Sequence, residues 1–287
     1  MKDKSNENLL KYSLNSPWQF VVVILMYLVG AVGFPISIFT FLIKDYSAAN
    51  LVGTFLARLI CCALPIYLIF ALKLKQILYL KGFFNRFLLI IPFVLVAVNN
   101  FPFISIYLKD AAFIVSSWHE WLFYALAIFG GVLLEELTFR GLVLPTLYRK
   151  FKSEKHGVFF SVLYSSLLFG GAHLFNLLSG AGIGAVVMQV GYSFLIGGMC
   201  AIAFVKTGSF YNAVILHFIF NFGGMLLNYK MLTGSIWDLT TIIITAVLAV
   251  LVIVYAVYIL FKTNNCEFDE KILLNGAHES GCANKEN

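Results

Sequence analysis

Long apolar stretches alternate with short polar segments along most of the chain. Eight of these stretches come close to the roughly 20 residues that a helix needs to cross the hydrocarbon core of a bilayer. Lipid offers the backbone no hydrogen-bond partner, so stretches of this length are expected to be helical. The predicted spans are Trp18–Ile43, Leu51–Leu72, Phe87–Leu108, Trp121–Leu144, Val158–Leu178, Ala185–Val205, Phe210–Tyr229 and Trp237–Phe261.

This pattern predicts an all-α, polytopic membrane protein with about eight transmembrane helices. Residues 18–261 are expected to form one transmembrane domain, and the polar ends, 1–17 and 262–287, are expected to be cytoplasmic tails. The first span is too long for a removable signal peptide and lacks a small-residue cleavage site.

Composition agrees with the membrane class. The chain is 61% hydrophobic and 12% charged, whereas soluble domains have roughly 45–50% apolar and about 25% charged residues. The net charge of +6 does not indicate nucleic acid as a partner, because the basic residues lie in short loops between apolar stretches. The five cysteines show neither CxxC spacing nor a disulfide framework.

Basic residues also predict the orientation. If Arg140 is counted with the loop after the fourth span, sixteen lysines and arginines fall in the two tails and in the loops after the second, fourth and sixth spans, against three in the other loops. Lysine and arginine concentrate on the cytoplasmic side of membrane proteins. We therefore expect a multi-pass protein of the cell (plasma) membrane with both termini in the cytoplasm.

The fourth span carries charged residues within an apolar run. Charged side chains at the centre of a membrane helix cost roughly 2.5–3.5 kcal/mol on insertion scales, so they call for a reason. Glu136 and Arg140 are one helical turn apart and are expected to form an ion pair. Glu135 lies about 100° around the helix and is free to face another helix. A purely structural charge cluster is the alternative interpretation.

Two further spans carry histidine and asparagine. The fifth contains LLFGGAHLFN, in which Phe169 and His173 share a face and Asn176 follows. The seventh contains ILHFIFN, in which His217 and Asn221 share a face. Taken alone, His173 is more typical of a satisfied core histidine than of a catalyst. The pair His217 and Asn221 is also typical of hydrogen bonding between packed helices.

The depth of these residues indicates a single site. Counted from the basic loops at 1.5 Å per residue, Glu135, His173, His217 and Asn221 lie roughly 16–27 Å from the same membrane face. A helix break at Gly141 or Pro145 would bring Glu135 closer to that face. We expect all four side chains to share one layer near the middle of the bilayer.

Such a set can hydrolyse an amide without a covalent intermediate. A carboxylate in a low-dielectric cavity can act as general base toward water, and a histidine can orient that water. A second histidine and an asparagine amide can donate hydrogen bonds to the oxyanion. The residues also suit zinc, with Glu135, His173 and His217 as ligands, so the residues alone leave metal dependence open. The chain has no HExxH or GxGD motif.

Three motifs occur in order on these spans: EExxxR, FxxxH and HxxxN. Their residues are Glu135, Glu136 and Arg140, then Phe169 and His173, then His217 and Asn221. In this the chain resembles the CAAX protease and bacteriocin-processing (CPBP) family of intramembrane proteases, which includes the type II CAAX prenyl endopeptidases. The resemblance covers residues 121–228, a little over a third of the chain.

The resemblance implies an eight-helix fold with an intramembrane catalytic cavity. Glu135 would activate water together with His173, and His217 and Asn221 would stabilise the oxyanion. The other motif residues, with Asn176, would support the site. Members of the family are described both as metalloproteases and as metal-independent glutamate proteases.

The resemblance predicts an endopeptidase that acts on a membrane-embedded or lipidated peptide or protein within the bilayer. Within the family, the alternative to CAAX processing is maturation of, or immunity to, a secreted peptide. A non-enzymatic protein, such as a proton-coupled transporter or a scaffold, is an alternative of another class. Transport is disfavoured because the sequence has no internal repeat, which many transporters have.

Overall fold

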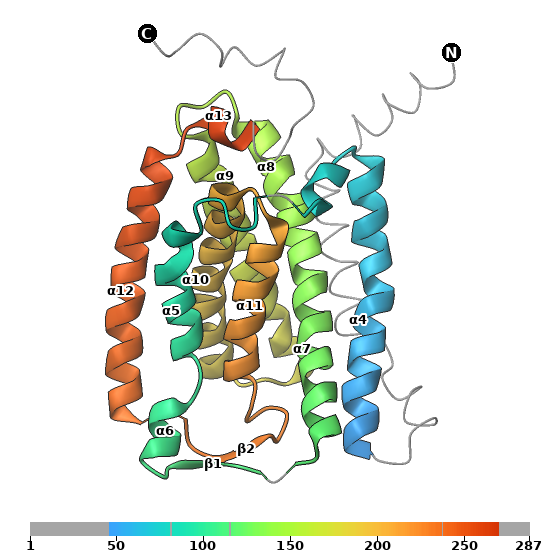
Figure 1. Ribbon diagram of the computed structural model, residues 1–287, viewed down its shortest axis with the longest axis vertical. Coiled ribbons are helices and arrows are strands. Elements are labelled where there is room, and N and C mark those ends of the chain that lie inside the picture. The colour runs from blue at the N-terminus through green and yellow to red at the C-terminus, as the bar shows by residue number, and fades with distance from the viewer. Residues whose placement is uncertain (1–45, 81, 115, 237, 270–287) are drawn as a thin grey trace.

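The structure is a computed structural model that describes residues 46–80, 82–114, 116–236 and 238–269. Most of these residues are helical (Figure 1). The elements are α4 (Tyr46–Ala71), η1 (Lys75–Leu78), η2 (Phe87–Ile90), α5 (Ile91–Asn99), α6 (Phe103–Tyr107), β1 (Ala111–Phe113), α7 (Trp118–Thr138), η3 (Phe139–Val143), α8 (Leu144–Phe151), α9 (Gly157–Ala172), η4 (His173–Ser179), α10 (Ile183–Thr207), α11 (Phe210–Gly224), β2 (Leu232–Gly234), α12 (Leu239–Lys262) and α13 (Asn265–Phe268).

Five helical stretches of the described residues are long and apolar enough to cross a membrane. They are Ala49–Ala71, Trp118–Phe151, Gly157–Ser179, Ile183–Thr207 and Leu239–Lys262. They correspond to the second, fourth, fifth, sixth and eighth predicted spans, so the prediction of a helical membrane protein is confirmed. The first predicted span, 18–43, lies outside the described residues, and the total of eight is not confirmed.

The third predicted span, 87–108, is not one helix. The helix ends at Asn99, and the chain turns before it enters α6. Pro102 explains the break, because proline has no N–H to donate and disfavours helical backbone in the residue before it. Asn100 fixes the turn by donating a side-chain hydrogen bond of 2.7 Å to the carbonyl oxygen of Phe220.

The seventh predicted span, 210–229, is also too long, because α11 ends at Gly224. Close packing against the turn after α5 explains the two glycines at this end. A Cβ atom at Gly223 would lie 2.6 Å from Cδ2 of Phe101, and one at Gly224 would overlap the side chain of Asn100. Beyond this contact the chain turns and leads into β2.

A short antiparallel ribbon of β1 and β2 closes one end of the bundle, which the all-α prediction missed. Ala111 pairs with Gly234 and Phe113 with Leu232. Next to the ribbon, the Asp238 carboxylate caps α12 by accepting a hydrogen bond of 2.9 Å from the Thr241 N–H. The hydroxyl and the N–H of Thr241 together lower the pKa of Asp238 to about 2.

The opposite end is held by α13, which the sequence analysis had assigned to a polar tail. Glu267 of α13 accepts a hydrogen bond of 2.8 Å from Lys206 at the end of α10 and also pairs with Arg86. The buried ring of Phe268 stacks on Tyr148 of α8, with ring centroids 4.0 Å apart. Loops rich in basic residues therefore meet at this end of the bundle (Figure 1).

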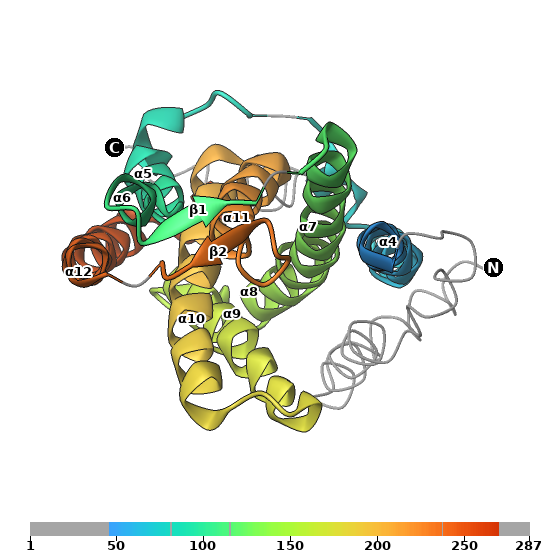
Figure 2. The same ribbon diagram turned by 90° about the horizontal axis from the view of Figure 1, so that it is seen from below.

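The helices differ in how much of their surface the protein covers. In the most apolar window of the continuous helix 118–151, 56% of the residues are buried, against 11% for α12. Seen along the bundle axis, α12 and α4 lie at opposite edges, with α11 between them (Figure 2). The polar motifs thus lie on interior helices, and α12 offers apolar side chains to lipid.

Candidate active site

The two adjacent glutamates of α7 lie in different environments. The side chain of Glu136 is fully buried, whereas that of Glu135 is 19% exposed and lines a cavity. The helix does not break after them at Gly141 or Pro145. It continues through one π-helical turn, η3, into α8. Such turns are frequent at functional sites because they redirect side chains within a helix.

Arg140, in the π turn, neutralises the buried glutamate. Its Nη1 lies 2.9 Å from Oε1 of Glu136, which confirms the predicted ion pair. Its Nη2 donates a hydrogen bond of 2.7 Å to the carbonyl oxygen of Gly197 on α10. Its Cζ lies 4.9 Å from the ring centroid of Phe169. The guanidinium is 1% exposed, so this cluster is closed to solvent.

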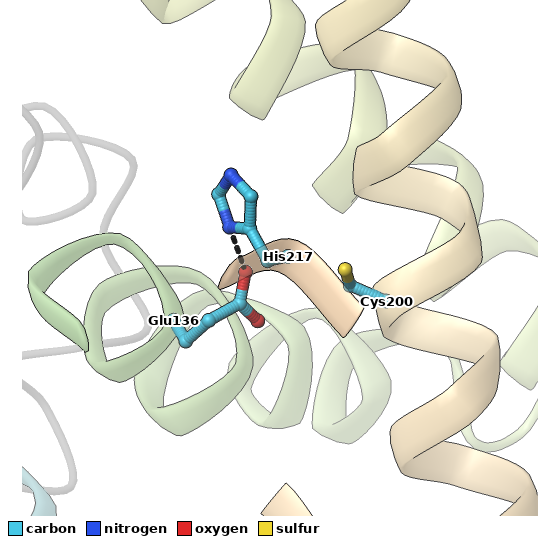
Figure 3. A group of neighbouring side chains, drawn as sticks. All are labelled: Glu136, Cys200 and His217. Carbon is cyan, nitrogen blue, oxygen red and sulfur yellow. Dashed lines mark hydrogen bonds and ion pairs between the residues drawn. The ribbon is translucent and has the colours of Figure 1, made fainter. Parts of the chain in front are cut away.

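His217 of α11 lies between the two carboxylates. Its Nδ1 is 2.7 Å from Oε1 of Glu136, and its Nε2 is 3.4 Å from Oε2 of Glu135. Figure 3 shows the ring nitrogen directed at the Glu136 carboxylate. A carboxylate oxygen that pairs with a guanidinium accepts hydrogen bonds, so Nδ1 is the donor in this contact. Asn221, one turn further along α11, has its Nδ2 3.0 Å from the same Nε2.

His173 begins η4, the 3-10 turn in which the fifth span continues. Its Nδ1 is 3.0 Å from the carbonyl oxygen of Phe169. A carbonyl can only accept, so Nδ1 donates and Nε2 keeps its lone pair. Asn176 lies in the same turn and its side chain is directed to α10. It donates a hydrogen bond of 2.7 Å to Oε1 of Gln189 on α10.

The buried ring of Phe169 separates the two histidines. Its centroid lies 5.4 Å from that of His173 and 5.6 Å from that of His217, and both pairs meet edge to face. On another side, a Cβ atom at Gly197 would lie 3.0 Å from Cδ1 of Phe169. The ring is therefore fixed by close packing, and it fixes the distance between the imidazoles.

One cavity of about 420 Å³ collects the predicted residues. Glu135, His173, His217 and Asn221 all line it, although they come from α7, η4 and α11. Phe169 and Asn176 line it as well, whereas Glu136 and Arg140 lie behind its wall.

Sequence reasoning missed several lining residues. Arg58 of α4, Gln189 and Tyr192 of α10, and Tyr229 all line the cavity. Arg58 gave a signal, because it is a charged residue inside an apolar span. The other three belong to no motif and could not be singled out.

A metal ion needs several ligand atoms close to one another. In the described part of the chain, the ligand atoms that lie within 4.8 Å of one another belong to Glu136, Cys200 and His217. In that group, Oε1 of Glu136 already binds the Arg140 guanidinium and Nδ1 of His217, so its Oε2, which has no hydrogen-bond partner among the described residues, would be the glutamate's ligand atom.

The set predicted for zinc was Glu135, His173 and His217. Their ligand atoms do not form such a group among the described residues. Nδ1 of His173 is engaged by a carbonyl and Nδ1 of His217 by a carboxylate, which leaves Nε2 of each ring as the possible ligand atom, as is usual for metal-binding histidines. As the side chains lie, the ligand atoms of the predicted zinc set are not gathered around one point, although these residue types suit zinc.

Comparison with known families agrees with the motifs. Residues 117–223 match the family model described as Type II CAAX prenyl endopeptidase Rce1-like. The match contains all three motifs and nearly coincides with the stretch 121–228 in which the resemblance was noted, so the resemblance is confirmed for this part of the chain. Searches of curated proteins and of solved structures gave no significant match.

Proposed function

We propose, from the match of residues 117–223 to the type II CAAX prenyl endopeptidase family, that this membrane protein is an intramembrane endopeptidase. It would hydrolyse a peptide bond of a membrane-associated substrate. The observation that carries the proposal is the cavity that brings Glu135, His173, His217 and Asn221 together from separate helices. This is the equipment that water-dependent amide hydrolysis needs.

In the proposed mechanism, Glu135 is the general base. Its carboxylate takes a proton from a water molecule, and the hydroxide oxygen attacks the carbonyl carbon of the scissile bond. His173 orients the water through Nε2, because its Nδ1 donates to the Phe169 carbonyl. When the C–N bond breaks, the proton on Glu135 passes to the leaving amine nitrogen. The water oxygen stays on the new carboxyl group.

His217 and Asn221 stabilise the oxyanion of the tetrahedral intermediate. Glu136 fixes the His217 ring through Nδ1, so Nε2 is directed to the side where Asn221 and Glu135 lie. To donate to the oxyanion, Nε2 must carry a proton as well as Nδ1. The Asn221 amide supplies a second donor within reach of the same point. The proposed mechanism uses no metal, because a glutamate-activated water needs no further ligand and the ligand atoms of Glu135, His173 and His217 are not gathered around one point among the described residues.

The proposed substrate is a lipidated peptide, as the family description suggests. The test uses purified full-length protein in detergent micelles and a synthetic peptide with an S-farnesyl cysteine near its C-terminus, with products identified by mass spectrometry. We expect cleavage by the natural protein and a loss of at least about a hundredfold in Glu135→Gln, which keeps the shape of the side chain but cannot take the proton. Cleavage at the same rate by both proteins would refute the proposal.

Two further arms sharpen this test. Exhaustive chelation is expected to leave the rate unchanged, whereas a loss that added Zn²⁺ restores would make the histidines metal ligands. A protein that cleaves no prenylated or unmodified membrane peptide, yet carries protons across vesicle membranes in a Glu135-dependent way, would instead be a transporter.

We also propose that the protein lies in the plasma membrane with the end that carries α13 in the cytoplasm. The concentration of basic residues in the loops at that end supports this orientation. Ser153 is exposed in the loop between α8 and α9, so a Ser153→Cys protein can report the side. Labelling of this cysteine by an impermeant reagent in intact cells would reverse the orientation.

A further inference from the structure

Two successive glycines, Gly130 and Gly131, lie in the middle of α7, just before the glutamates. Glycine weakens a helix relative to alanine, because it loses more backbone freedom on folding. Each position therefore calls for a physical reason. The structure gives different reasons for the two.

Gly130 is explained by helix packing. A Cβ atom there would lie 3.1 Å from Cδ2 of Phe55, 3.2 Å from Cβ of Arg58 and 3.3 Å from the carbonyl oxygen of Phe55. All three atoms belong to α4. The missing side chain allows α4 and α7 to approach closely at this point.

Gly131 has no such explanation. A Cβ atom there would meet no atom within 4 Å. Gly131 instead lines the cavity, one helical turn before Glu135 and on the same face of α7. The rise of one turn is about 5.4 Å, so the space above Gly131 lies directly beside the proposed general base.

We propose that Gly131 is a specificity-determining residue, the floor of a subsite that holds one side chain of the substrate close to the scissile bond. This inference rests on the proposed function. In an extended peptide, side chains on the same side are about 6.6 Å apart. When the scissile carbonyl group of the substrate lies at Glu135, a substrate side chain one or two residues from the scissile bond therefore lies over Gly131.

Apart from Glu135, the cavity-lining residues of α7 around Gly131 are apolar and indicate an apolar occupant, while the charged Arg58 of α4 lines the same cavity. Ala127, Ile128 and Leu134 belong to the same cavity-lining stripe of α7. The cavity also has polar lining, to which the paired amides of Asn176 and Gln189 belong. Apolar groups on α7 suit a substrate side chain, and amides suit the backbone of an extended segment. Because Gly131 has no side chain, the space above it determines the size of the largest substrate side chain that fits.

The test compares Gly131→Ala, Gly131→Leu and the natural protein, full length and in micelles. The substrates are S-farnesylated peptides that differ only in having alanine or phenylalanine at one of the two positions after the modified cysteine. The readout is the ratio of kcat/KM for the phenylalanine peptide to that for the alanine peptide. We expect this ratio to fall in order of the size of the new side chain, by at least about tenfold in Gly131→Leu.

Gly130→Ala is the matched control, because it adds the same methyl group one position earlier. It should lower the melting temperature by crowding α4 and leave the ratio unchanged. Gly131→Ala should keep or raise the melting temperature, since alanine favours the helix and meets no atom. A constant ratio across the Gly131 variants, or an equal loss for both peptides, would overturn the inference. Cleavage that does not depend on Glu135 would instead overturn the proposed function.

Discussion

Glu135 and Glu136 are neighbours in sequence, yet they belong to two regions with opposite properties. Glu136 lies in a closed cluster with Arg140, beside the buried ring of Phe169, and is fully buried. Glu135 lies on the wall of the cavity, which His173 also lines. His217 connects the two regions by a hydrogen bond to one glutamate and an ion-pair contact to the other.

The comparison separates two uses of buried charge. In the closed cluster every charge meets an opposite one, so the cluster orders helices and orients His217. In the cavity, the donors and acceptors of the wall face space that a substrate and a water molecule can enter. Changes on the cavity wall should therefore remove activity and leave stability unchanged. Changes in the closed cluster should lower both activity and stability.

The largest expected effect is on the cavity wall. His173→Ala removes the group that orients the water, so the cleavage rate should fall by roughly 10²–10⁴-fold while the melting temperature stays close to that of the natural protein. Leu174→Ala is the control on the same turn, because this side chain is 50% exposed and is not among the residues that line the cavity. Equal losses in both variants would indicate damage to η4 rather than to chemistry.

Arg140→Ala tests the closed cluster. It strands the fully buried Glu136 carboxylate without its partner, so we expect a loss of about 3–5 kcal/mol in stability and a fall in protein abundance. Lys150→Ala, at an exposed position of α8, should change stability by less than about 0.5 kcal/mol. An Arg140→Ala protein with normal melting behaviour but no turnover would move Arg140 into the chemistry and break the division between the two regions.

The smallest effect is expected far from both regions, at the ribbon end. Asp238→Ala removes the cap of α12 and should lower the melting temperature by about 2–4 °C at neutral pH without changing the cleavage rate. The pKa of Asp238 is about 2 in the folded protein, below its ordinary value of 3.8. The carboxylate therefore stabilises the fold fully above pH 3.8, and this contribution is lost as the pH falls toward 2.

Melting curves at pH 7 and at pH 2 check this linkage. The difference between natural protein and Asp238→Ala should shrink at the lower pH. Asp238→Asn keeps a good capping group and should lose less at pH 7. A difference that is the same at both pH values would show that the charge of Asp238 contributes nothing.

Much of the site could be predicted because charge in an apolar span is conspicuous. Hydropathy gave the long spans, and helical periodicity paired Glu136 with Arg140 and His217 with Asn221. The common depth of the motifs then brought them into one layer. These inferences use local spacing and the cost of burying polar groups, which a sequence carries directly.

The rest depends on contacts between distant segments. A break in the third span could be suspected from Pro102, but the end of α11 depends on how its glycines pack against Phe101 and Asn100. Gln189 and Tyr192 reach the cavity only because α10 packs beside α9 and η4. Helical periodicity could not predict the hydrogen bond between Glu136 and His217, because the two residues lie far apart in the chain.

The central claim is that Glu135 and His173 act on the same water molecule as one unit. A double-mutant cycle on cleavage of the farnesylated peptide tests it most directly, with Glu135→Ala, His173→Ala and both changes together. The effects of changing groups that act as a unit are strongly non-additive. The double variant should therefore retain about the same cleavage rate as the less active of the two single variants. If instead the two losses multiply, Glu135 and His173 act independently, and the cavity does not work as proposed.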